Sequence, residues 1–320
     1  MSDFMNIRRV EFMATKRCNA NCKHCSVPIN SDPSEKGHLD IGAIKKCYTF
    51  LVENYPISST MVYGGEPLLS IDNIIELFGV ASEYKIPIID LITSGFISFK
   101  ESKDSVYDVV DKLSNSGVKR ILLSVDAFHQ ERIPVEYVEW FLDRVIQLDF
   151  CEILLHPAWL ISKEDDNSFN LRTHEILDTM SSKYHIGISD GNYIIPSGSN
   201  KQNIGFYYNA KEIHMDQKCG EIPYTNPLDK ITSVRILPNG NLNICRGMTI
   251  GNVFEQSIEK ILETYSPNYS QISSTLYSKG VQGIYELAKE YGTIINPKDY
   301  YGICDLCSDC ISLLKERGVK

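Results

Sequence analysis

The chain has 320 residues, a formal net charge of −9, 43% hydrophobic residues and 23% charged residues. This length and composition predict a globular protein with one large α/β domain and a smaller appendage. The acidic balance disfavours a nucleic-acid binder, which needs a basic face. The sequence contains no run of eighteen apolar residues, so it predicts no membrane-spanning helix. The N-terminus lacks the apolar segment of a signal peptide, so we expect a cytoplasmic protein.

Strand-like and helix-like runs alternate along the first two thirds of the chain. The expected strands are 9–15, 59–65, 87–95, 118–126, 151–160 and 184–189, and the expected helices are 39–55, 71–84, 104–115, 134–148 and 172–182. Asp40 is a plausible N-cap for the first helix, and Pro134 suits the first turn of the fourth. Strands that alternate with helices indicate a parallel sheet with crossover helices. Six such units predict a partial (β/α)6 TIM-like barrel, with the site at the C-terminal ends of the strands.

Turn-forming residues replace this pattern between residues 190 and 230. We therefore expect two domains, a barrel over 1–205 and a small α+β C-terminal domain over 206–320. The second domain is predicted to contain a β-hairpin that turns at Asn239-Gly240, followed by helices near 257–264 and 281–291.

Three cysteines with the spacing C-x3-C-x2-C, in "CNANCKHC", follow the first predicted strand. Ten cysteines in a chain without an export signal indicate metal binding or catalysis rather than disulfides. Three thiolates can hold a four-iron cluster and leave one iron open for a ligand. The triplet together with His24 also permits a zinc site, although structural zinc sites usually come as two separated pairs. The second predicted strand ends in "VYGGEP", where glycines allow close backbone approach and a carboxylate can recognise an ammonium group.

Together, the cysteine triplet and the GGEP segment resemble the radical SAM superfamily over residues 8–190. The resemblance implies a partial (β/α)6 barrel, a [4Fe-4S] cluster and S-adenosyl-L-methionine bound at its open iron. Reductive cleavage of that cofactor would give a radical that removes a hydrogen atom from a substrate. The implied cluster ligands are Cys18, Cys22 and Cys25, and the implied cofactor-binding residues are Gly64, Gly65, Glu66, Ser124 and Asp126. His24 stands where the superfamily often has an aromatic residue, so its role stays open.

The C-terminal cysteines resemble those of SPASM domains, or of their shortened twitch form, which hold auxiliary four-iron clusters. The residues that match are Cys219, Cys245, Cys304 and Cys307, with Cys310 as a spare thiol or as a substitute for Cys307. We therefore expect two [4Fe-4S] clusters in all, with a zinc site as the alternative for the C-terminal set. Cys47 and Cys151 are expected to be small buried apolar residues.

The chain is similar to small radical SAM peptide-modifying enzymes, including peptide epimerases. The first cysteine of the triplet is at residue 18, so we expect no leader-peptide-binding domain in front of it. We expect hydrogen abstraction from a peptide or peptide-like substrate, leading to epimerisation or cross-linking, with Cys310 as a candidate hydrogen-atom donor. One alternative is a small-molecule dehydrogenase in which His129 or His156 acts as the base, and a non-enzymatic alternative is a zinc-stabilised binding module. A reductase or a flavodoxin or ferredoxin would supply electrons.

Overall fold

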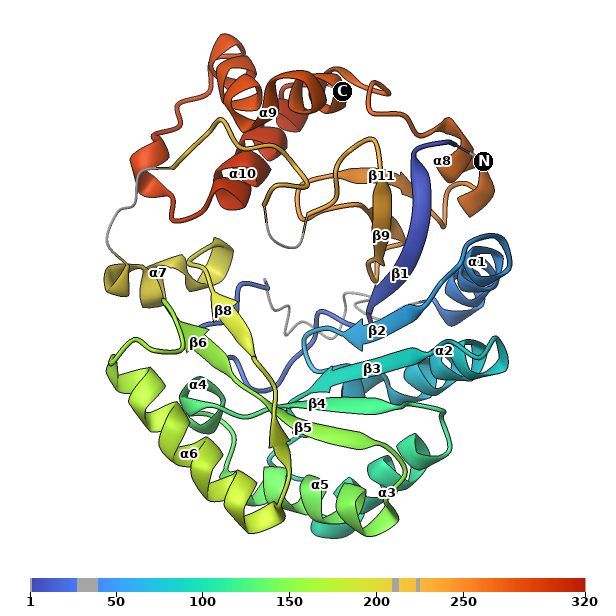
Figure 1. The fold of residues 1–320 in the computed structure, drawn as a ribbon, viewed down its shortest axis with the longest axis vertical. Helices are drawn as coiled ribbons and strands as arrows, with labels where there is room; N and C mark the ends of the chain where they lie inside the picture. Colours follow the sequence, from blue (N-terminus) through green and yellow to red (C-terminus); the bar gives the residue numbers. More distant parts are fainter. Residues whose placement is uncertain (1, 28–39, 209–212, 223–224, 320) are drawn as a thin grey trace.

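The computed structural model describes residues 2–27, 40–208, 213–222 and 225–319. Within these residues the largest feature is a nine-stranded sheet with the strand order β11-β10-β9-β1-β2-β3-β4-β5-β7. Every neighbouring pair from β9 to β7 is parallel. The expected α/β fold with a partial TIM-like barrel is confirmed, and the sheet curves around the centre of the molecule in Figure 1.

Five of the six barrel strands are shorter than the sequence pattern indicates, because their ends turn into loops, whereas the first begins four residues earlier than expected and is longer. They are β1 (Met5–Met13), β2 (Ser59–Tyr63), β3 (Ile88–Thr93), β4 (Arg120–Ser124), β5 (Glu152–His156) and β7 (Gly187–Ile188). Along β1 the buried side chains of Val10 and Phe12 alternate with the partly exposed Arg9, Glu11 and Met13. Since side chains alternate across a strand, one face packs on helices and the other faces the interior of the barrel.

Helices cover the outer face of the barrel, at the right and bottom of Figure 1. They are α1 (Ile41–Asn54), α2 (Ile71–Glu83), α3 (Lys103–Ser114), α5 (Val135–Leu148) and α6 (Ser168–Tyr184), with a short helix α4 (Ala127–Gln130) between β4 and α5. Asp40 caps α1 as expected, because its carboxylate accepts hydrogen bonds from Gly42 N and Ala43 N. Pro134 is the N-cap of α5 rather than part of its first turn. Leu39, expected at the start of α1, lies outside the described residues.

The expected strand over 151–160 is wrong as a single element. Pro157 has no N–H to donate, so the ladder of β5 stops at His156. The chain continues as β6 (Ala158–Leu160), which pairs in parallel with β8 (Asn192–Ile194) in a separate two-stranded sheet. The second sheet lies beside the open side of the barrel, to the left in Figure 1.

The C-terminal part adds to the barrel sheet. The expected hairpin is present as β9 (Ile231–Ile236) and β10 (Asn241–Asn243), and Gly240 at its turn has a φ of +83°. Strand β11 (Thr249–Asn252) pairs with β10, and β9 pairs in parallel with β1. Main-chain hydrogen bonds between β9 and β1 therefore join the two parts of the chain on either side of the domain boundary expected near residue 205.

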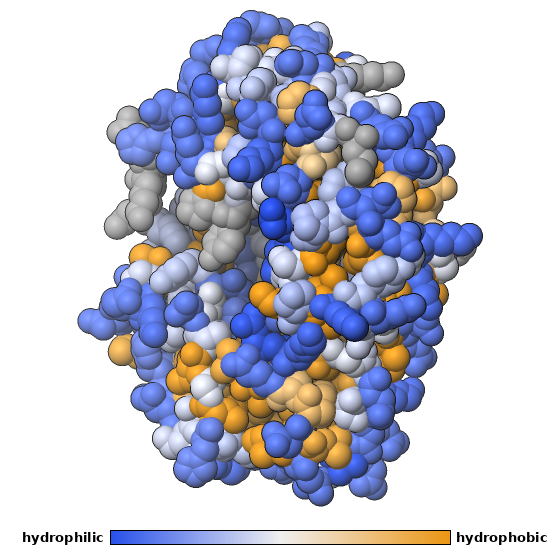
Figure 2. Space-filling view, turned by 45° about the vertical axis from the view of Figure 1, so that its right-hand side comes forward, coloured by the Kyte–Doolittle hydropathy of each residue, from blue (hydrophilic) through white to orange (hydrophobic). Residues whose placement is uncertain are grey.

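Short helices lead from the barrel to the C-terminal part, and three longer ones follow the hairpin. They are α7 (Lys201–Ile204), flanked by 3-10 turns, then α8 (Ile258–Thr264), α9 (Gln271–Glu290) and α10 (Ile303–Glu316). Gly280, with a φ of +65°, kinks α9. None of the helices in the described part of the chain combines the length and apolar character that crossing a bilayer requires. Polar side chains cover much of the face in Figure 2, with apolar side chains gathered in its lower half.

Candidate active site

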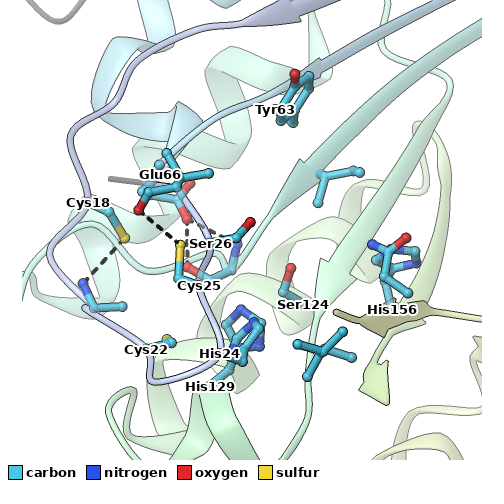
Figure 3. Close-up of a pocket in the computed structure, with 18 of the residues that line it drawn as sticks. Cys18, Cys22, His24, Cys25, Ser26, Tyr63, Glu66, Ser124, His129 and His156 are labelled. Carbon is cyan, nitrogen blue, oxygen red and sulfur yellow. Dashed lines mark hydrogen bonds between the residues drawn. The ribbon is translucent and has the colours of Figure 1, made fainter. Parts of the chain in front are cut away.

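A cavity of about 320 Å³ lies at the C-terminal ends of the barrel strands. Residues from the cysteine triplet, the GGEP segment, the ends of β3, β4 and β5, and strand β8 line it. Figure 3 shows the thiols of Cys18, Cys22 and Cys25 on one side of this space and His156 on the other. Segments far apart in the sequence meet here because the C-terminal ends of parallel strands share one edge of the sheet.

The GGEP segment holds the start of the cysteine loop by backbone contacts. Gly65 N donates to Thr15 O at 2.7 Å, and Glu66 N donates to Arg17 O at 2.8 Å. A Cβ atom on Gly64 would lie 2.6 Å from Thr15 O, and one on Gly65 would lie 2.1 Å from Arg17 O. Both positions therefore require glycine, since the two backbone segments touch.

The three N-terminal thiols line the cavity and are partly buried. The pKa of all three thiols is raised, mainly by burial. The pKa of Cys18 is raised to about 11. The charges of Asp126, Cys18 and Cys25 raise the pKa of Cys22 further. Such a set is suited to a positively charged metal centre, which would favour the thiolate form.

His24 lies between the second and third cysteines, and its ring also lines the cavity. Burial, followed by the neighbouring His129, lowers the pKa of His24 to about 4. The centroids of the two rings are 4.7 Å apart. Figure 3 shows the two side chains next to each other. Nδ1 of His24 is buried without a hydrogen-bond partner among the described residues. A buried polar atom without a partner is unusual in a folded protein.

Glu66 is fixed by four hydrogen bonds. One carboxylate oxygen accepts from Leu68 N and from Thr93 Oγ1, and the other accepts from Ser94 N and Ser94 Oγ, at 2.5 to 3.0 Å. Its side chain is 1% exposed, and burial raises its pKa although the hydrogen bonds act in the opposite direction. The carboxylate therefore has one orientation at the wall of the cavity.

Ser124 lines the cavity, but Asp126 does not. Strand β4 ends at Ser124, so the strand alternation that placed both residues inward no longer applies at Asp126. Asp126 instead caps α4, where its carboxylate accepts from His129 N at 2.9 Å and contacts His129 Nδ1 at 2.7 Å. Burial opposes ionisation of Asp126, but the charge and hydrogen bonds of His129 outweigh it and lower the pKa to about 2. Asp126 thus orients His129, which does line the cavity.

His156 also lines the cavity, at the end of β5. Its Nε2 accepts a hydrogen bond from Asn192 Nδ2 at 2.8 Å, and its Nδ1 lies 2.7 Å from Ser189 Oγ. Because Nε2 accepts, the proton is on Nδ1 in this arrangement. Burial lowers the pKa of His156 to about 4, so the ring is neutral near pH 7.

Four C-terminal cysteines from three segments meet in one place. Burial and then the charges of Cys245, Cys219, Cys304 and Cys310 raise the pKa of Cys307. Cys304 and Cys307 lie in the first turns of α10, and Cys245 follows β10. Cys310 is fully buried one turn further along α10 and does not line the cavity, so the structure does not place it for the expected hydrogen-atom transfer.

The two remaining cysteines stand apart from both sets. Cys47 is buried in α1, as expected, whereas Cys151 is only partly buried. Burial raises the pKa of each thiol to about 12. Neither lines the cavity.

Residues 13–149 match the model of the Radical SAM superfamily. The barrel is a radical SAM domain. Among solved structures, the chain is similar to Streptococcus suis SuiB bound to S-adenosylmethionine, with 14% identity, a TM-score of 0.55, and coverage of 93% of this chain and 77% of SuiB. It is also similar to anSMEcpe with bound AdoMet, with 12% identity, a TM-score of 0.52 and coverage of 80% of each chain. At these identities the likeness shows the fold alone.

Two curated relatives match parts of the chain. Putative protein YfkA of Bacillus subtilis is 31% identical over 86 residues, which are 27% of this chain and 20% of that protein. GTP 3',8-cyclase of Campylobacter jejuni is 27% identical over 177 residues, which are 52% of this chain and 51% of that protein. The matched segments thus span a fifth and about half of these relatives. The family match over residues 13–149 and the similarity to these enzymes support an enzyme that contains a radical SAM domain.

Radical SAM enzymes use a [4Fe-4S] cluster and S-adenosylmethionine, and they require a substrate and an electron donor. The donors around the cavity fit these groups, because the three cysteines and the buried Glu66 all line one space. Thiolates are the usual ligands of such clusters. A carboxylate with a fixed orientation is suited to an ammonium group.

A polar network joins the radical SAM cavity to the C-terminal part. Arg235 on β9 forms an ion pair with Glu11 on β1 at 3.1 Å, and its guanidinium lies 5.5 Å from the centre of the Tyr63 ring. Tyr63 lines the cavity, and its hydroxyl is buried without a hydrogen-bond partner among the described residues. Burial opposes the charged form of Arg235, but Tyr63, Glu11 and, to a smaller extent, Cys245 outweigh it and raise the pKa of Arg235.

Sequence reasoning missed several residues of the radical SAM cavity. Tyr63 ends β2 and directly precedes the GGEP segment, so its position in the sequence could have predicted that it lies at the site. Ser94 and Thr93 end β3 in the same way and hold Glu66. Asn192 could not have been found, because β8 follows a turn-rich segment and its position depends on pairing with β6.

Proposed function

We propose that this radical SAM enzyme modifies a peptide or peptide-like substrate by hydrogen-atom abstraction, and that it holds an auxiliary four-iron cluster. The observation that carries the proposal is the clustering of four thiols, one buried and three partly buried, in the C-terminal part, next to the strand whose Arg235 lies over the Tyr63 ring at the cavity wall. An electron acceptor at that position would make an oxidative outcome possible. A reductase, a flavodoxin or a ferredoxin is the proposed electron donor.

The barrel residues would have distinct roles in this reaction. Cys18, Cys22 and Cys25 would hold the catalytic cluster, and Glu66 would hold the ammonium group of S-adenosylmethionine. When bound, these groups supply a radical that takes a hydrogen atom from a substrate carbon. The chain itself binds, orients and shields, since its contribution in cofactor chemistry is placement and exclusion of water.

The C-terminal thiols would hold the auxiliary cluster through Cys219, Cys245, Cys304 and Cys307. Burial is the main cause that raises the pKa of each, and neighbouring thiol charges add to it for Cys219 and Cys304. Four thiolates so close together would repel one another unless a metal centre compensates their charge. Zinc is the competing occupant, because four thiolates also suit a tetrahedral zinc site.

Two observations support a peptide substrate. The apolar side chains of Tyr193 and Ile195 line the cavity and are 54% and 53% exposed, so a large partner has a surface to cover at the mouth. The chain also shares its fold with anSMEcpe, for which a structure with AdoMet and the Kp18Cys peptide exists, at a TM-score of 0.52.

Iron and sulfide per chain after anaerobic reconstitution test the two-cluster proposal. The control is a variant with Cys18, Cys22 and Cys25 all changed to Ala. We expect about eight irons in the parent and about four in the variant, as two four-iron clusters require. About four in the parent and none in the variant would make the C-terminal set a zinc site or free thiols.

Mass spectrometry of candidate peptides incubated with the reduced enzyme in deuterium oxide tests the substrate. Epimerisation predicts uptake of deuterium from solvent, and oxidative cross-linking predicts a mass loss of two hydrogens. Neither change should occur with the triple Ala variant. Absence of both changes with the parent enzyme would refute the peptide proposal.

A second candidate is a small-molecule radical SAM dehydrogenase. The similarity to GTP 3',8-cyclase over half the chain favours a small substrate. His129 and His156 both line the cavity, and each is a candidate for the base of such a reaction. Product formation from a small molecule, without any change in peptides, would select this alternative.

A further inference from the structure

We propose that Asn200 is a positioning residue of the catalytic site, which fixes the second half of the cysteine loop through a buried relay of hydrogen bonds that begins at Arg246. The cysteine loop is defined as residues 16–27, which contain the cysteine triplet. The inference rests on the proposed catalytic cluster at this triplet. It depends neither on a peptide substrate nor on the occupant of the C-terminal set of thiols.

The cysteine loop needs support from other segments, because residues 16–27 form no helix or strand. The GGEP segment holds the start of the loop through Thr15 O and Arg17 O. Further along, Cys25 N donates to Cys22 O at 3.1 Å, which closes a turn within the loop but does not attach it to the rest of the protein. The position of these two thiols therefore depends on contacts with residues outside the loop.

Asn200 supplies such a contact from the 3-10 turn η2 (Gly198–Asn200). Its Nδ2 donates to the carbonyl of His24, the residue before Cys25, at 2.7 Å, and its Oδ1 accepts from Ser197 N at 2.7 Å. Only one orientation of the amide satisfies both partners, since a main-chain N–H donates and a carbonyl accepts. Asn200 is 1% exposed. Its amide is therefore engaged with the protein on both sides, and it acts on the loop rather than on a bound ligand.

The relay continues into the C-terminal part. Arg246, which directly follows Cys245, donates from Nη1 to Ser197 Oγ at 2.7 Å. Ser197 is 2% exposed, so it is as well shielded as Asn200. The relay thus runs from the residue after Cys245, through Ser197 and Asn200, to the residue before Cys25. Buried side chains join the segments that carry the two sets of thiols.

The turn η2 is also packed closely against both segments. Gly198 has a φ of +55°, and a Cβ atom there would lie 3.1 Å from Ser26 O and 3.4 Å from Arg246 Nη2. Ser26 follows Cys25, and both line the cavity in Figure 3. The main chain of the turn therefore touches the cysteine loop and the guanidinium together. A shift of the turn would displace the end of the loop, and metal sites tolerate little displacement of their ligands.

The test compares Asn200→Ala with Asn200→Asp. Alanine removes both hydrogen bonds of the side chain, whereas aspartate keeps an acceptor for Ser197 N and loses the donor to His24 O. In the reconstituted enzyme, we expect both variants to bind S-adenosylmethionine about three- to tenfold more weakly than the parent, as loss of one hydrogen bond predicts. The change that S-adenosylmethionine causes in the electron paramagnetic resonance spectrum of the reduced enzyme should also differ from that of the parent.

Asn203 provides the matched control. Its Nδ2 donates to Lys23 O at 3.2 Å, but Asn203 is exposed, so water can replace this bond. Asn203→Ala and Asn203→Asp should keep the parental affinity and spectrum. The aspartate variant also controls for a negative charge added beside the loop. Melting temperatures of all variants check that they fold.

A second readout needs no metal. Iodoacetamide alkylation of the apo protein, followed by peptide mass spectrometry, measures how readily the loop opens. In Asn200→Ala and Asn200→Asp, Cys25 should react about three- to tenfold faster than in the parent, whereas Cys151 should react at the parental rate. Ser197→Ala removes the acceptor for Arg246 and should give a smaller increase at Cys25. It should add nothing in the Asn200→Ala background, because the relay is already broken there.

The outcomes separate this role from the proposed cluster. Parental affinity, spectrum and Cys25 alkylation in both Asn200 variants would overturn the positioning role and leave the catalytic cluster in place. The same holds if Asn200→Asp behaves as the parent, because Asn200 would then hold only its own turn. If the Asn200 variants do not fold, parental affinity and alkylation in Ser197→Ala would overturn the relay. A parent that binds no iron at the triplet would refute the catalytic cluster, and with it the positioning role.

Discussion

Changing Gly65 to Ala is expected to remove the catalytic cluster while leaving the C-terminal set of thiols intact. An added Cβ would lie 2.1 Å from Arg17 O and 2.7 Å from the Arg17 carbonyl carbon. Real Cβ atoms essentially never lie within 3.0 Å of such atoms, so the Arg17 backbone would have to move by about 0.9 Å. Cys18 follows Arg17 directly, so the first proposed cluster ligand would move with it.

The energetic cost follows from the contacts that the shift breaks. Gly65 N to Thr15 O, at 2.7 Å, and Glu66 N to Arg17 O, at 2.8 Å, are the bonds that join the two segments. Each backbone hydrogen bond contributes about 0.5–1.5 kcal/mol, so the loss of both would cost about 1–3 kcal/mol. The larger functional effect comes from misplacing a ligand, since metal sites tolerate little displacement.

Gly79→Ala is the matched control. Gly79 lies on the exposed face of α2, and a Cβ atom there would meet nothing within 4 Å. Alanine in a helix interior is favoured over glycine by about 0.5–1 kcal/mol, so this variant should be slightly more stable than the parent. The two Gly→Ala changes are thus expected to act with opposite signs.

The assay is iron per chain, binding of S-adenosylmethionine and melting temperature for the parent and both variants. Gly65→Ala should lose the same iron as the variant that lacks Cys18, Cys22 and Cys25, and it should melt at a lower temperature. Parental iron content and melting temperature in Gly65→Ala would refute the reasoning, because the overlap with Arg17 O would then have been relieved without displacing the loop.

Three other substitutions test separate parts of the structure. Cys307→Ala should lower the iron content by about one four-iron cluster whereas Cys310→Ala should not, and equal losses would refute the assignment of Cys307 over Cys310. Tyr63→Phe removes a buried hydroxyl without a described partner, so the free energy of unfolding should stay constant or rise by about 1 kcal/mol; a clear fall in melting temperature would contradict this. Asn170→Leu leaves the N–H of Leu160 unpaired, and we expect a loss of about 1–3 kcal/mol in chemical denaturation, with parental stability as the contrary result.

Local patterns in the sequence were sufficient to predict the elements that form the centre of the site. The spacing of Cys18, Cys22 and Cys25 and the GGEP segment each lie directly after a strand, so knowing the strands places both at one edge of the sheet. The helix cap at Asp40 and the turn at Asn239-Gly240 were likewise predictable, because they depend only on neighbouring residues.

Features that depend on strand ends and on distant pairing were not predictable. Asp126 was expected in the cavity because the strand was extended two residues too far, whereas it caps α4 and orients His129. Pro157 ended β5 early and began a second sheet that no periodicity indicated. The partner of β6 is β8, and the parallel register between them is set by tertiary contacts rather than by local propensity.

The pairing of β9 with β1 explains how one sheet relates the two sets of cysteines. Strand β1 runs directly into the loop that contains Cys18, and β9 lies beside it in parallel, with Arg235 opposite Glu11. The hairpin then reverses the chain, because Asn243 on β10 pairs back to Arg235, and Cys245 follows two residues later. The loop of Cys18 therefore lies beyond the C-terminal end of β1, whereas Cys245 lies back along β9.

This arrangement fixes the two sets of thiols relative to each other without a separate interface between domains. A hinge between the barrel and the C-terminal part would have to break the β1–β9 hydrogen bonds and the ion pair between Glu11 and Arg235. Tyr63 on β2 lines the cavity, and Arg235 on β9 lies over the Tyr63 ring. These two side chains therefore connect the cavity with the C-terminal part. Electron transfer between the proposed clusters would then depend on a distance set by strand register rather than on domain motion.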